Sequence, residues 1–228
     1  MKSSPMLVLG LVFALALVSR SSAQLVDFDY YYFVVQWPGS YCDLQKACCY
    51  PLTGKPAANF SIHGLWPEFL DGTWPQDCDT SQTFDLEQVR DLVPELNKYW
   101  GTLTCPSSDS TKFWKHEWEK HGTCTGLTQH EFFSKTLALM KSINLGAALE
   151  KANIVPSDTA TYNVTQVQSA LACAIEEHTP GVECNIAKSG NNQLYQVYVC
   201  VDKDGTTLIP CPAYPNGRCN ATVYWPTF

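Results

Sequence analysis

The chain has 228 residues, 45% of them hydrophobic and 16% charged, and its formal net charge at pH 7 is −7. The excess of acidic side chains excludes a broad basic surface, so a nucleic acid cannot be held by long-range attraction to the whole molecule. Any polyanion would have to be bound locally, in a small cationic pocket.

The first 23 residues predict a signal peptide that is removed from the mature protein. Lys2 supplies the positive charge, residues 6–18 are almost continuously apolar, and residues 21–23 are small enough for a signal peptidase. The apolar stretch is shorter than the roughly 20 residues of a membrane-spanning helix, so no membrane partner is expected. Residues 24–228 then carry 13 basic and 22 acidic side chains, a net charge of −9, and are long enough for one domain.

Strands and helices are mixed without a regular rhythm along the mature chain. Residues 29–37 (DYYYFVVQW) are rich in aromatic and β-branched side chains and predict a buried strand, and residues 59–63 predict a second one. Helical spacing of apolar side chains predicts helices over residues 85–100, interrupted by Pro94, and over residues 128–143 and 165–177. Residues 193–202 and 206–209 predict a hairpin. The mixture favours an α+β fold, a single domain with a central antiparallel sheet surrounded by helices.

All 11 cysteines lie beyond residue 41, which is typical of a secreted domain stapled by disulfides. Their odd number leaves at least one thiol free or paired outside the chain. The sequence has no Cys-x-x-Cys, which argues against zinc-finger and thioredoxin sites. Three sequons offer sites for N-linked glycans, at Asn59, Asn163 and Asn220.

Residues 115–124 (KHEWEKHGTC) concentrate titratable side chains in a segment of helical composition. At about 100° per residue, one side of a helix would carry His116, Glu117, Lys120 and His121, while the tryptophans fall on the next sector and can be buried. A solvated helix of mixed charge would also explain this composition. The two histidines are five residues apart, which excludes the zinc-binding pattern with histidines four residues apart.

A third histidine, His63, lies in residues 60–67 (FSIHGLWP), after β-type residues and before a glycine. This position predicts an imidazole fixed at the end of a strand, and for a single histidine a structural role is the simpler interpretation. Trp66 fits either the core or an exposed platform on which a nucleobase stacks.

Together, FSIHGLWP and KHEWEKHGTC resemble the two active-site segments of the RNase T2 family of acid ribonucleases, in the same order and with cysteines between them. Residues 33–42 resemble the N-terminal strand of plant members, and Cys200 with residues 209–212 resembles their C-terminal region. The acidic composition is more similar to the S-like enzymes than to the basic self-incompatibility ribonucleases. The resemblance implies a monomeric endoribonuclease that is secreted or delivered to the vacuole.

The resemblance also implies roles for the titratable residues. His121 would be the general base and His63 the general acid when the 2′-hydroxyl of RNA attacks the adjacent phosphorus and gives a 2′,3′-cyclic phosphate, which is then hydrolysed. His116 and Lys120 would hold the phosphate, and Glu117 would orient or polarise the site. Glu117 is also expected to raise the pKa values of the histidines and to shift activity towards acidic pH. The reaction requires no metal or cofactor, takes single-stranded RNA and excludes DNA.

Base contacts are expected from three side chains: a hydrogen bond from Gln36 and stacking on Trp66 and Phe113. Ordinary packing in a strand and a helix would also account for Gln36 and Phe113. The family's disulfide pattern implies five pairs and leaves Cys173 as a free thiol, expected to be a small buried side chain on a helix; the pairs are Cys42–Cys48, Cys49–Cys105, Cys78–Cys124, Cys184–Cys219 and Cys200–Cys211.

Three other functions compete with this interpretation. A storage or defence protein with the same fold would be catalytically weak or inactive, but its expected signature is the loss of a catalytic histidine, and His63, His116 and His121 are all present. A self-incompatibility ribonuclease is disfavoured by the acidic charge. A secreted metalloprotein is disfavoured by the histidine spacing.

Overall fold

The computed structural model describes residues 26–46, 48–106 and 109–228. The predicted signal peptide therefore lies outside the described residues. The strands are β1 (Tyr30–Gln36), β2 (Ser61–Glu68), β3 (Ser157–Asn163), β4 (Gly181–Ile186), β5 (Asn192–Val201) and β6 (Thr222–Trp225). The helices are α1 (Pro38–Cys42), α2 (Val93–Tyr99), α3 (Thr111–Lys120), α4 (Gln129–Ser142), α5 (Leu145–Lys151) and α6 (Val164–Ala172), with 3₁₀ helices η1 (Leu86–Leu92) and η2 (Gly122–Cys124).

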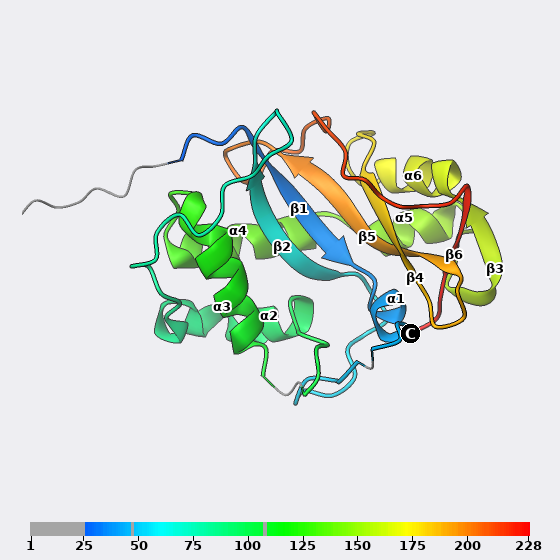
Figure 1. The fold of residues 1–228 in the computed structure, drawn as a ribbon, viewed down its shortest axis with the longest axis horizontal. Helices are drawn as coiled ribbons and strands as arrows, with labels where there is room; N and C mark the ends of the chain where they lie inside the picture. Colours follow the sequence, from blue (N-terminus) through cyan, green and yellow to red (C-terminus); the bar gives the residue numbers. More distant parts are fainter. Residues whose placement is uncertain (1–25, 47, 107–108) are drawn as a thin grey trace, which may run out of the picture.

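One sheet organises the molecule, with strand order β2-β1-β5-β6-β3 and β4 paired with β5. All strand pairs are antiparallel except β5 and β6, which meet in parallel at one residue pair. Figure 1 shows β2, β1 and β5 side by side, with α2, α3 and α4 gathered beside β2 and with α5 and α6 towards the other end. The predicted α+β domain with a central, mainly antiparallel sheet is confirmed.

The central strand β1 separates two apolar layers. All seven of its residues are buried, because it pairs with a strand on each side and is covered on both faces. Phe33 and Val35 point into the large core beneath the helices, whereas Tyr30, Tyr32 and Val34 point into a smaller cluster on the opposite face. The alternation of side chains along a strand thus places a row of tyrosines on the face that also carries the titratable groups described below.

The strand β2 contains a β-bulge at the histidine of the FSIHGLWP segment. Along the β1–β2 ladder, Val35 is opposite Ile62 and Val34 is opposite Gly64, so His63 is the extra residue. A bulge of this kind bends the strand and redirects the side chain of the extra residue. The prediction of a strand ending near residue 63 was too short, since β2 continues to Glu68.

Three other predicted elements differ from the structure. The helix expected over residues 165–177 is α6, which ends at Ala172. The expected helix over residues 85–100 is two helices, the 3₁₀ helix η1 and then α2, because Pro94 occupies the first turn of α2 and so begins a helix. The expected hairpin near residue 204 is reduced to a single bridge between Val201 and Leu208, without a second strand. Within the described residues, no helix has the length and apolarity needed to cross a membrane.

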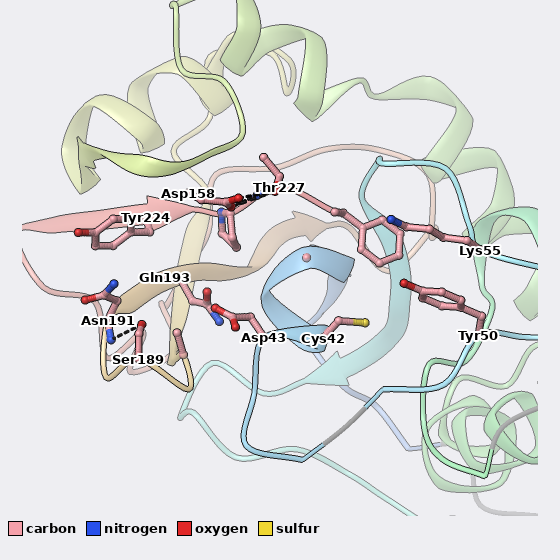
Figure 2. A pocket seen from close by; sticks show the side chains of 14 residues that line it. Cys42, Asp43, Tyr50, Lys55, Asp158, Ser189, Asn191, Gln193, Tyr224 and Thr227 are labelled. Atoms are coloured by element: carbon pink, nitrogen blue, oxygen red, sulfur yellow. Dashed lines mark hydrogen bonds between the residues drawn. The ribbon is translucent and has the colours of Figure 1, made fainter.

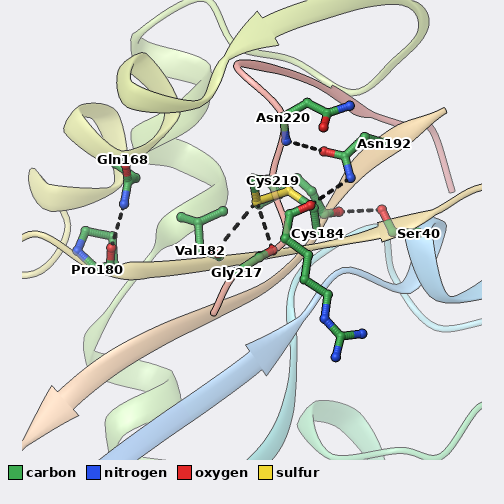
Figure 3. Close-up of a disulfide and its surroundings, with 11 residues drawn as sticks. Ser40, Gln168, Pro180, Val182, Cys184, Asn192, Gly217, Cys219 and Asn220 are labelled. Atoms are coloured by element: carbon green, nitrogen blue, oxygen red, sulfur yellow. Dashed lines mark hydrogen bonds between the residues drawn. A yellow bond between two sulfur atoms is a disulfide. The ribbon is translucent and has the colours of Figure 1, made fainter. Parts of the chain in front are cut away.

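Five disulfides join the same cysteines that the family resemblance implies. Figure 3 shows the Cys184–Cys219 bond, which ties β4 to the C-terminal segment. Cys173 is free, and it is exposed at the end of α6. The expectation that this thiol is buried is wrong, because α6 ends at Ala172 and its apolar face is formed by other residues.

Candidate active site

The titratable side chains of the two motifs line one cavity of about 540 Å³. It holds six of the predicted site residues, namely His63, Trp66, His116, Glu117, Lys120 and His121. Two segments that are about 50 residues apart in the chain therefore meet, as the sequence predicts. The tyrosine face of the sheet supplies the opposite wall, with Tyr30, Tyr32 and Tyr198.

The helix α3 and the turn after it position the second motif. Trp114 and Trp118 are buried on one face, which leaves His116 and Lys120 at the cavity. The helix ends at Lys120, and His121 follows as its C-cap, with its backbone N–H still donating to Glu117 O at 3.1 Å. The backbone N–H of Asp77 donates to Lys120 O at 2.8 Å, next to the Cys78–Cys124 disulfide. The helix end is thus fixed from outside the helix.

A pair of indole hydrogen bonds fixes the distance between the first motif and α3. Trp100 Nε1 donates to the backbone oxygen of His63 at 2.9 Å. Trp114 of α3 in turn donates through its Nε1 to Trp100 O at 2.8 Å. The bulged backbone of His63 is therefore linked to the helix that carries His116 and ends at the His121 cap.

Trp66 connects the carboxyl group of Glu117 with the imidazoles of His63 and His121. Its Nε1 donates to Glu117 Oε2 at 2.9 Å. Its ring stacks on that of His121 at 5.2 Å between centroids and 25° between planes, and meets His63 edge-on at 4.9 Å. A Cβ at Gly64 would lie 2.1 Å from the indole nitrogen and 2.2 Å from Glu117 Oε2, so only glycine permits this contact.

Burial controls the pKa values in the cavity. Burial, with the charges of His116 and Lys120, lowers the pKa of His63 to about 4, although the hydrogen bond to Gln196 opposes this change. Burial, with the charge of Lys120, lowers the pKa of His121 to about 3. Burial raises the pKa of Glu117 to about 8, against the hydrogen bond from Trp66. The expectation that Glu117 raises the histidine pKa values is wrong, because a buried, neutral carboxyl group has no charge with which to do so.

The more exposed groups supply positive charge. His116 is exposed at the rim, and the desolvation that remains there, together with the charge of Lys120, lowers its pKa. Lys120 is half-buried and belongs to no ion pair among the described residues. Its ammonium group is therefore available to an anion that enters the cavity.

Two predicted base contacts lie outside this cavity. Gln36 is 4% exposed in β1, and its Oε1 accepts a weak hydrogen bond from the Tyr195 hydroxyl at 3.5 Å. Phe113 is half-buried in a separate hollow with Thr102, Thr104 and Lys112, and its ring lies 5.9 Å from that of His63. Phe113 is thus near the His63 ring but lines a different hollow, while Gln36 would need to be uncovered before it could touch a base.

The sequence analysis missed several side chains of the cavity. Glu68, two residues after Trp66, is buried there, and burial raises its pKa to about 8. Tyr30 and Tyr32 could have been found from their spacing of two, which puts them on one face of a strand. No local signal points to Trp74, Tyr198 or Tyr214, because sequence-distant segments bring them to the cavity.

A second cavity of about 500 Å³ lies at the opposite end of β5. Figure 2 shows Asp43, Lys55, Asp158 and Tyr224 around it, and its described lining contains no histidine. Lys55 contacts the Phe228 ring at 4.5 Å. Among the described residues, no group of three His, Cys, Asp or Glu side chains is arranged to hold a metal ion.

A family model, similar sequences and solved structures all point to the same family. The family model described as Ribonuclease T2 family matches residues 28–211. Ribonuclease 1 of Arabidopsis thaliana is 50% identical over 222 residues, which is 96% of each chain. Extracellular ribonuclease LE of Solanum lycopersicum is 50% identical over 205 residues, and intracellular ribonuclease LX of the same plant is 48% identical over 203, each over 89% of this chain and 88% or 85% of its own.

The solved structures agree. The crystal structure of RNase NT in complex with 5′-AMP superposes on this chain with a TM-score of 0.86 at 46% identity, and the match covers 89% of this chain and 100% of that one.

Proposed function

The chain belongs to the ribonuclease T2 family and is an RNase T2-type endoribonuclease, and we propose that it cuts single-stranded RNA without a metal, through a 2′,3′-cyclic phosphate, at acidic pH. The observation that carries this proposal is a pair of imidazoles in one cavity, the half-buried His63 and the buried His121, whose rings lie 4.9 and 5.2 Å from that of Trp66. Two imidazoles at one phosphate can serve as acid and base in turn.

In the first step, Nε2 of His121 takes the proton of the 2′-hydroxyl, and the 2′-oxygen forms a bond to phosphorus. The bond from phosphorus to the 5′-oxygen breaks, and the proton of His63 goes to that oxygen. In the second step the roles are exchanged: His63 takes a proton from water, the water oxygen bonds to phosphorus, and the 2′-oxygen leaves with a proton from His121. The product is a 3′-phosphate.

The remaining side chains stabilise charge on the phosphorane. Lys120 and His116 offer positive charge beside the cavity, and binding is stronger where negative charge accumulates in the transition state. Glu117 has a pKa of about 8 and is therefore protonated below that pH. A neutral carboxyl group that accepts from Trp66 can donate its own proton in a hydrogen bond to a phosphoryl oxygen, which a carboxylate would repel.

The pKa values support an acidic optimum. The base His121 must be neutral, which requires a pH above about 3, and the acid His63 must be protonated, which requires a pH below about 4 in the free protein. These two conditions give a bell-shaped dependence of kcat/KM with its maximum on the acidic side. In the complex, the phosphate charge raises both imidazole pKa values and extends activity upwards.

Relatives of this chain include extracellular and intracellular plant ribonucleases. Secretion is proposed for this chain from residues 1–23 and from its disulfides. The asparagines of all three sequons are exposed, which supports their proposed glycosylation. A monomer without membrane contact is proposed because one chain supplies every group in the cavity.

The proposal is tested with the mature chain on a single-stranded RNA and on DNA of the same sequence, from pH 3 to pH 8, with and without EDTA. We expect cleavage of RNA alone, a maximum below pH 6, no effect of EDTA and transient 2′,3′-cyclic ends. Equal cleavage of DNA, which lacks the attacking hydroxyl, or loss of activity in EDTA would refute the mechanism. Absence of RNA cleavage at every pH would instead support the inactive storage or defence protein.

A further inference from the structure

The half-buried His63 and the buried His121 differ in what their Nδ1 atoms contact. Nδ1 of His63 lies 2.6 Å from the side-chain amide of Gln196. Nδ1 of His121 is buried, and no described residue forms a hydrogen bond with it. Because Nδ1 of His63 is engaged, its Nε2 is the nitrogen left for a substrate. The partner on Nδ1 therefore decides which tautomer the cavity receives.

The contact between His63 and Gln196 is the first of three consecutive hydrogen bonds. Gln196 Oε1 lies 3.0 Å from the Tyr198 hydroxyl, and that hydroxyl lies 2.6 Å from Glu183 Oε2. Gln196 is 3% and Tyr198 7% exposed, so water competes little for these groups. Burial and the Glu183 carboxyl group raise the pKa of Tyr198, which keeps its hydroxyl proton in place as a donor.

The backbone holds these groups in register. Gln196 and Tyr198 are two residues apart on β5 and so share a face, and Gln196 is opposite Glu183 on β4. The next residue of β4, Cys184, forms a disulfide with Cys219, and its N–H donates to Gly217 O at 2.7 Å. Figure 3 shows this attachment of β4 to the C-terminal segment.

Counting donors distinguishes the two orientations of the Gln196 amide. If its nitrogen faces His63, the Tyr198 hydroxyl has one hydrogen for two acceptors, Gln196 Oε1 and the Glu183 carboxylate. If the amide is turned by 180°, Nδ1–H of His63 donates to Gln196 Oε1, one hydrogen of the amide nitrogen goes to the Tyr198 oxygen, and Tyr198 donates to Glu183. Each of the three contacts then has one hydrogen and one acceptor. Oxygen and nitrogen of an amide have the same shape, so the hydrogen-bond network decides the orientation.

We propose that Gln196 is a positioning residue for His63, whose Nδ1–H it accepts, and that Tyr198 and Glu183 hold the Gln196 amide in this orientation. The inference rests on the proposed ribonuclease function and adds residues on β4 and β5 to it. The proposed reaction needs His63 as a cation and then as a neutral base with a lone pair on Nε2. Nδ1 carries a hydrogen in both states, so one amide orientation serves both steps. The opposite tautomer would present Nε2–H and could not take a proton from water.

The positive charges around His63 disfavour its protonated state, which a hydrogen bond from Nδ1 to Gln196 would stabilise. The titratable groups that face its cavity are His116, Glu117, Lys120 and His121 from α3 and its cap, Tyr30 and Tyr32 from β1, Glu68 from β2, Tyr198 from β5 and Tyr214 from the C-terminal segment. His116 and Lys120 both oppose protonation of His63. The hydrogen bonds that run from Gln196 through Tyr198 to Glu183 reach Nδ1 of His63. They favour the protonated imidazole and leave its Nε2 free for the cavity.

The direct test is ¹⁵N NMR of the imidazoles in the full mature chain, which requires no activity. Above pH 6, neutral His63 should be the Nδ1–H tautomer in the wild type, and should move towards the Nε2–H tautomer in Gln196→Met. A wild-type His63 found as the Nε2–H tautomer would overturn the inference. This result is independent of whether the protein cuts RNA, so the inference and the proposed function fail separately.

Activity provides the second readout. Gln196→Met should lower kcat about 10–100-fold with little change of KM, which is the usual loss when a residue that hydrogen-bonds to a functional side chain is removed. It should also move the alkaline limb of the kcat/KM profile to lower pH, whereas Gln196→Glu should move the limb to higher pH by about one unit or more, because a carboxylate favours the imidazolium. Gln193→Met is the matched control, a buried glutamine of the same strand whose amide donates to Ser40 O.

The control variant should leave the alkaline limb unchanged. Tyr198→Phe and Glu183→Gln should each move the limb to lower pH by less than Gln196→Met does, and the double variant should equal the larger single effect. If the alkaline limb of the kcat/KM profile lay at the same pH in Gln196→Met, Gln196→Glu and the control, Gln196 would only fill space.

Discussion

Trp66 shows how one side chain sets the chemistry of three others. Its N–H donates to the Glu117 carboxyl group, its ring stacks on His121, and its ring is nearly perpendicular to that of His63. The sequence motif predicts an aromatic platform for a base, whereas in the structure one face of the indole is already occupied. The same packing removes water from the neighbouring groups and so lowers the imidazole pKa values and raises that of the carboxyl group.

The roles of the two histidines can be separated by the leaving group. His63→Ala and His121→Ala should each lower kcat on RNA about 10²–10⁴-fold, the range for general acid–base catalysis. On a nucleoside 3′-(4-nitrophenyl phosphate), whose leaving group needs no proton, only His63→Ala should recover activity. Recovery of His121→Ala instead would reverse the assignment. His130→Ala, a half-buried histidine that contacts Asp91, is the control and should behave as the wild type.

The raised pKa of Glu117 predicts that the free energy of unfolding depends on pH. Its folded pKa of about 8 lies above the ordinary value of 4.5, so between these pH values the folded state binds more protons than the unfolded chain, and the free energy of unfolding falls as pH rises. Glu117→Gln cannot ionise and so does not lose stability in this way. The free energy of unfolding of the variant, minus that of the wild type, should therefore grow from pH 4 to pH 8 by on the order of a few kcal/mol and then level off. Urea unfolding at several pH values measures it, and a difference that does not vary with pH would contradict the neutral carboxyl group.

At the scale of elements, the end of α3 and the bulge of β2 determine the geometry of the site. Neither would be fixed by its own residues, because a helix of ten residues frays and a bulge is a local irregularity. The Trp100 and Trp114 hydrogen bonds hold them together on one side. The Cys78–Cys124 disulfide holds the other side, three residues beyond His121.

Removal of that disulfide should therefore affect both stability and turnover. In the chain-entropy picture, replacing Cys78 and Cys124 by alanine, which opens a closure of 46 residues, should cost about 4 kcal/mol, whereas the 6-residue closure of Cys42–Cys48 should cost about 2 kcal/mol. Only the first pair should lower kcat, when measured well below both unfolding temperatures. An equal kcat for both double variants would show that the bond does not position His121.

At the scale of the whole molecule, the net negative charge and the positive charge at the cavity have opposite effects on the binding of RNA. Residues 24–228 carry a net charge of −9 with neutral histidines, while Lys120 and His116 line the cavity. We therefore expect few phosphate contacts to RNA, and the negative net charge opposes its approach at long range. Binding by such a site should depend on local geometry more than on ionic attraction.

The salt dependence of kcat/KM tests this distribution of charge. With one or two phosphate contacts to single-stranded RNA, a plot of log kcat/KM against log salt should have a slope between about −0.7 and −1.4. Lys120→Gln should make the slope shallower by about 0.7. A slope steeper than about −3 in the wild type would reveal further cationic contacts that the cavity does not contain.

The sequence by itself determined the fold class, the helix that carries His116, Glu117 and Lys120, and the two motifs that meet in the cavity. These features follow from local periodicity and from side-chain types, which any segment carries with it. The cysteine pairs came from family resemblance, since spacing alone leaves their connectivity open.

Only the tertiary structure decided the protonation of the site and its second layer of residues. Local pattern places Glu117 beside two histidines but cannot say how deeply they are buried, and burial by distant segments makes Glu117 neutral instead of a counter-ion. The same limit applies to Gln196, which reaches His63 from a strand more than 130 residues away. Desolvation and long-range hydrogen bonds depend on which elements pack together, and that information exists only in the folded molecule.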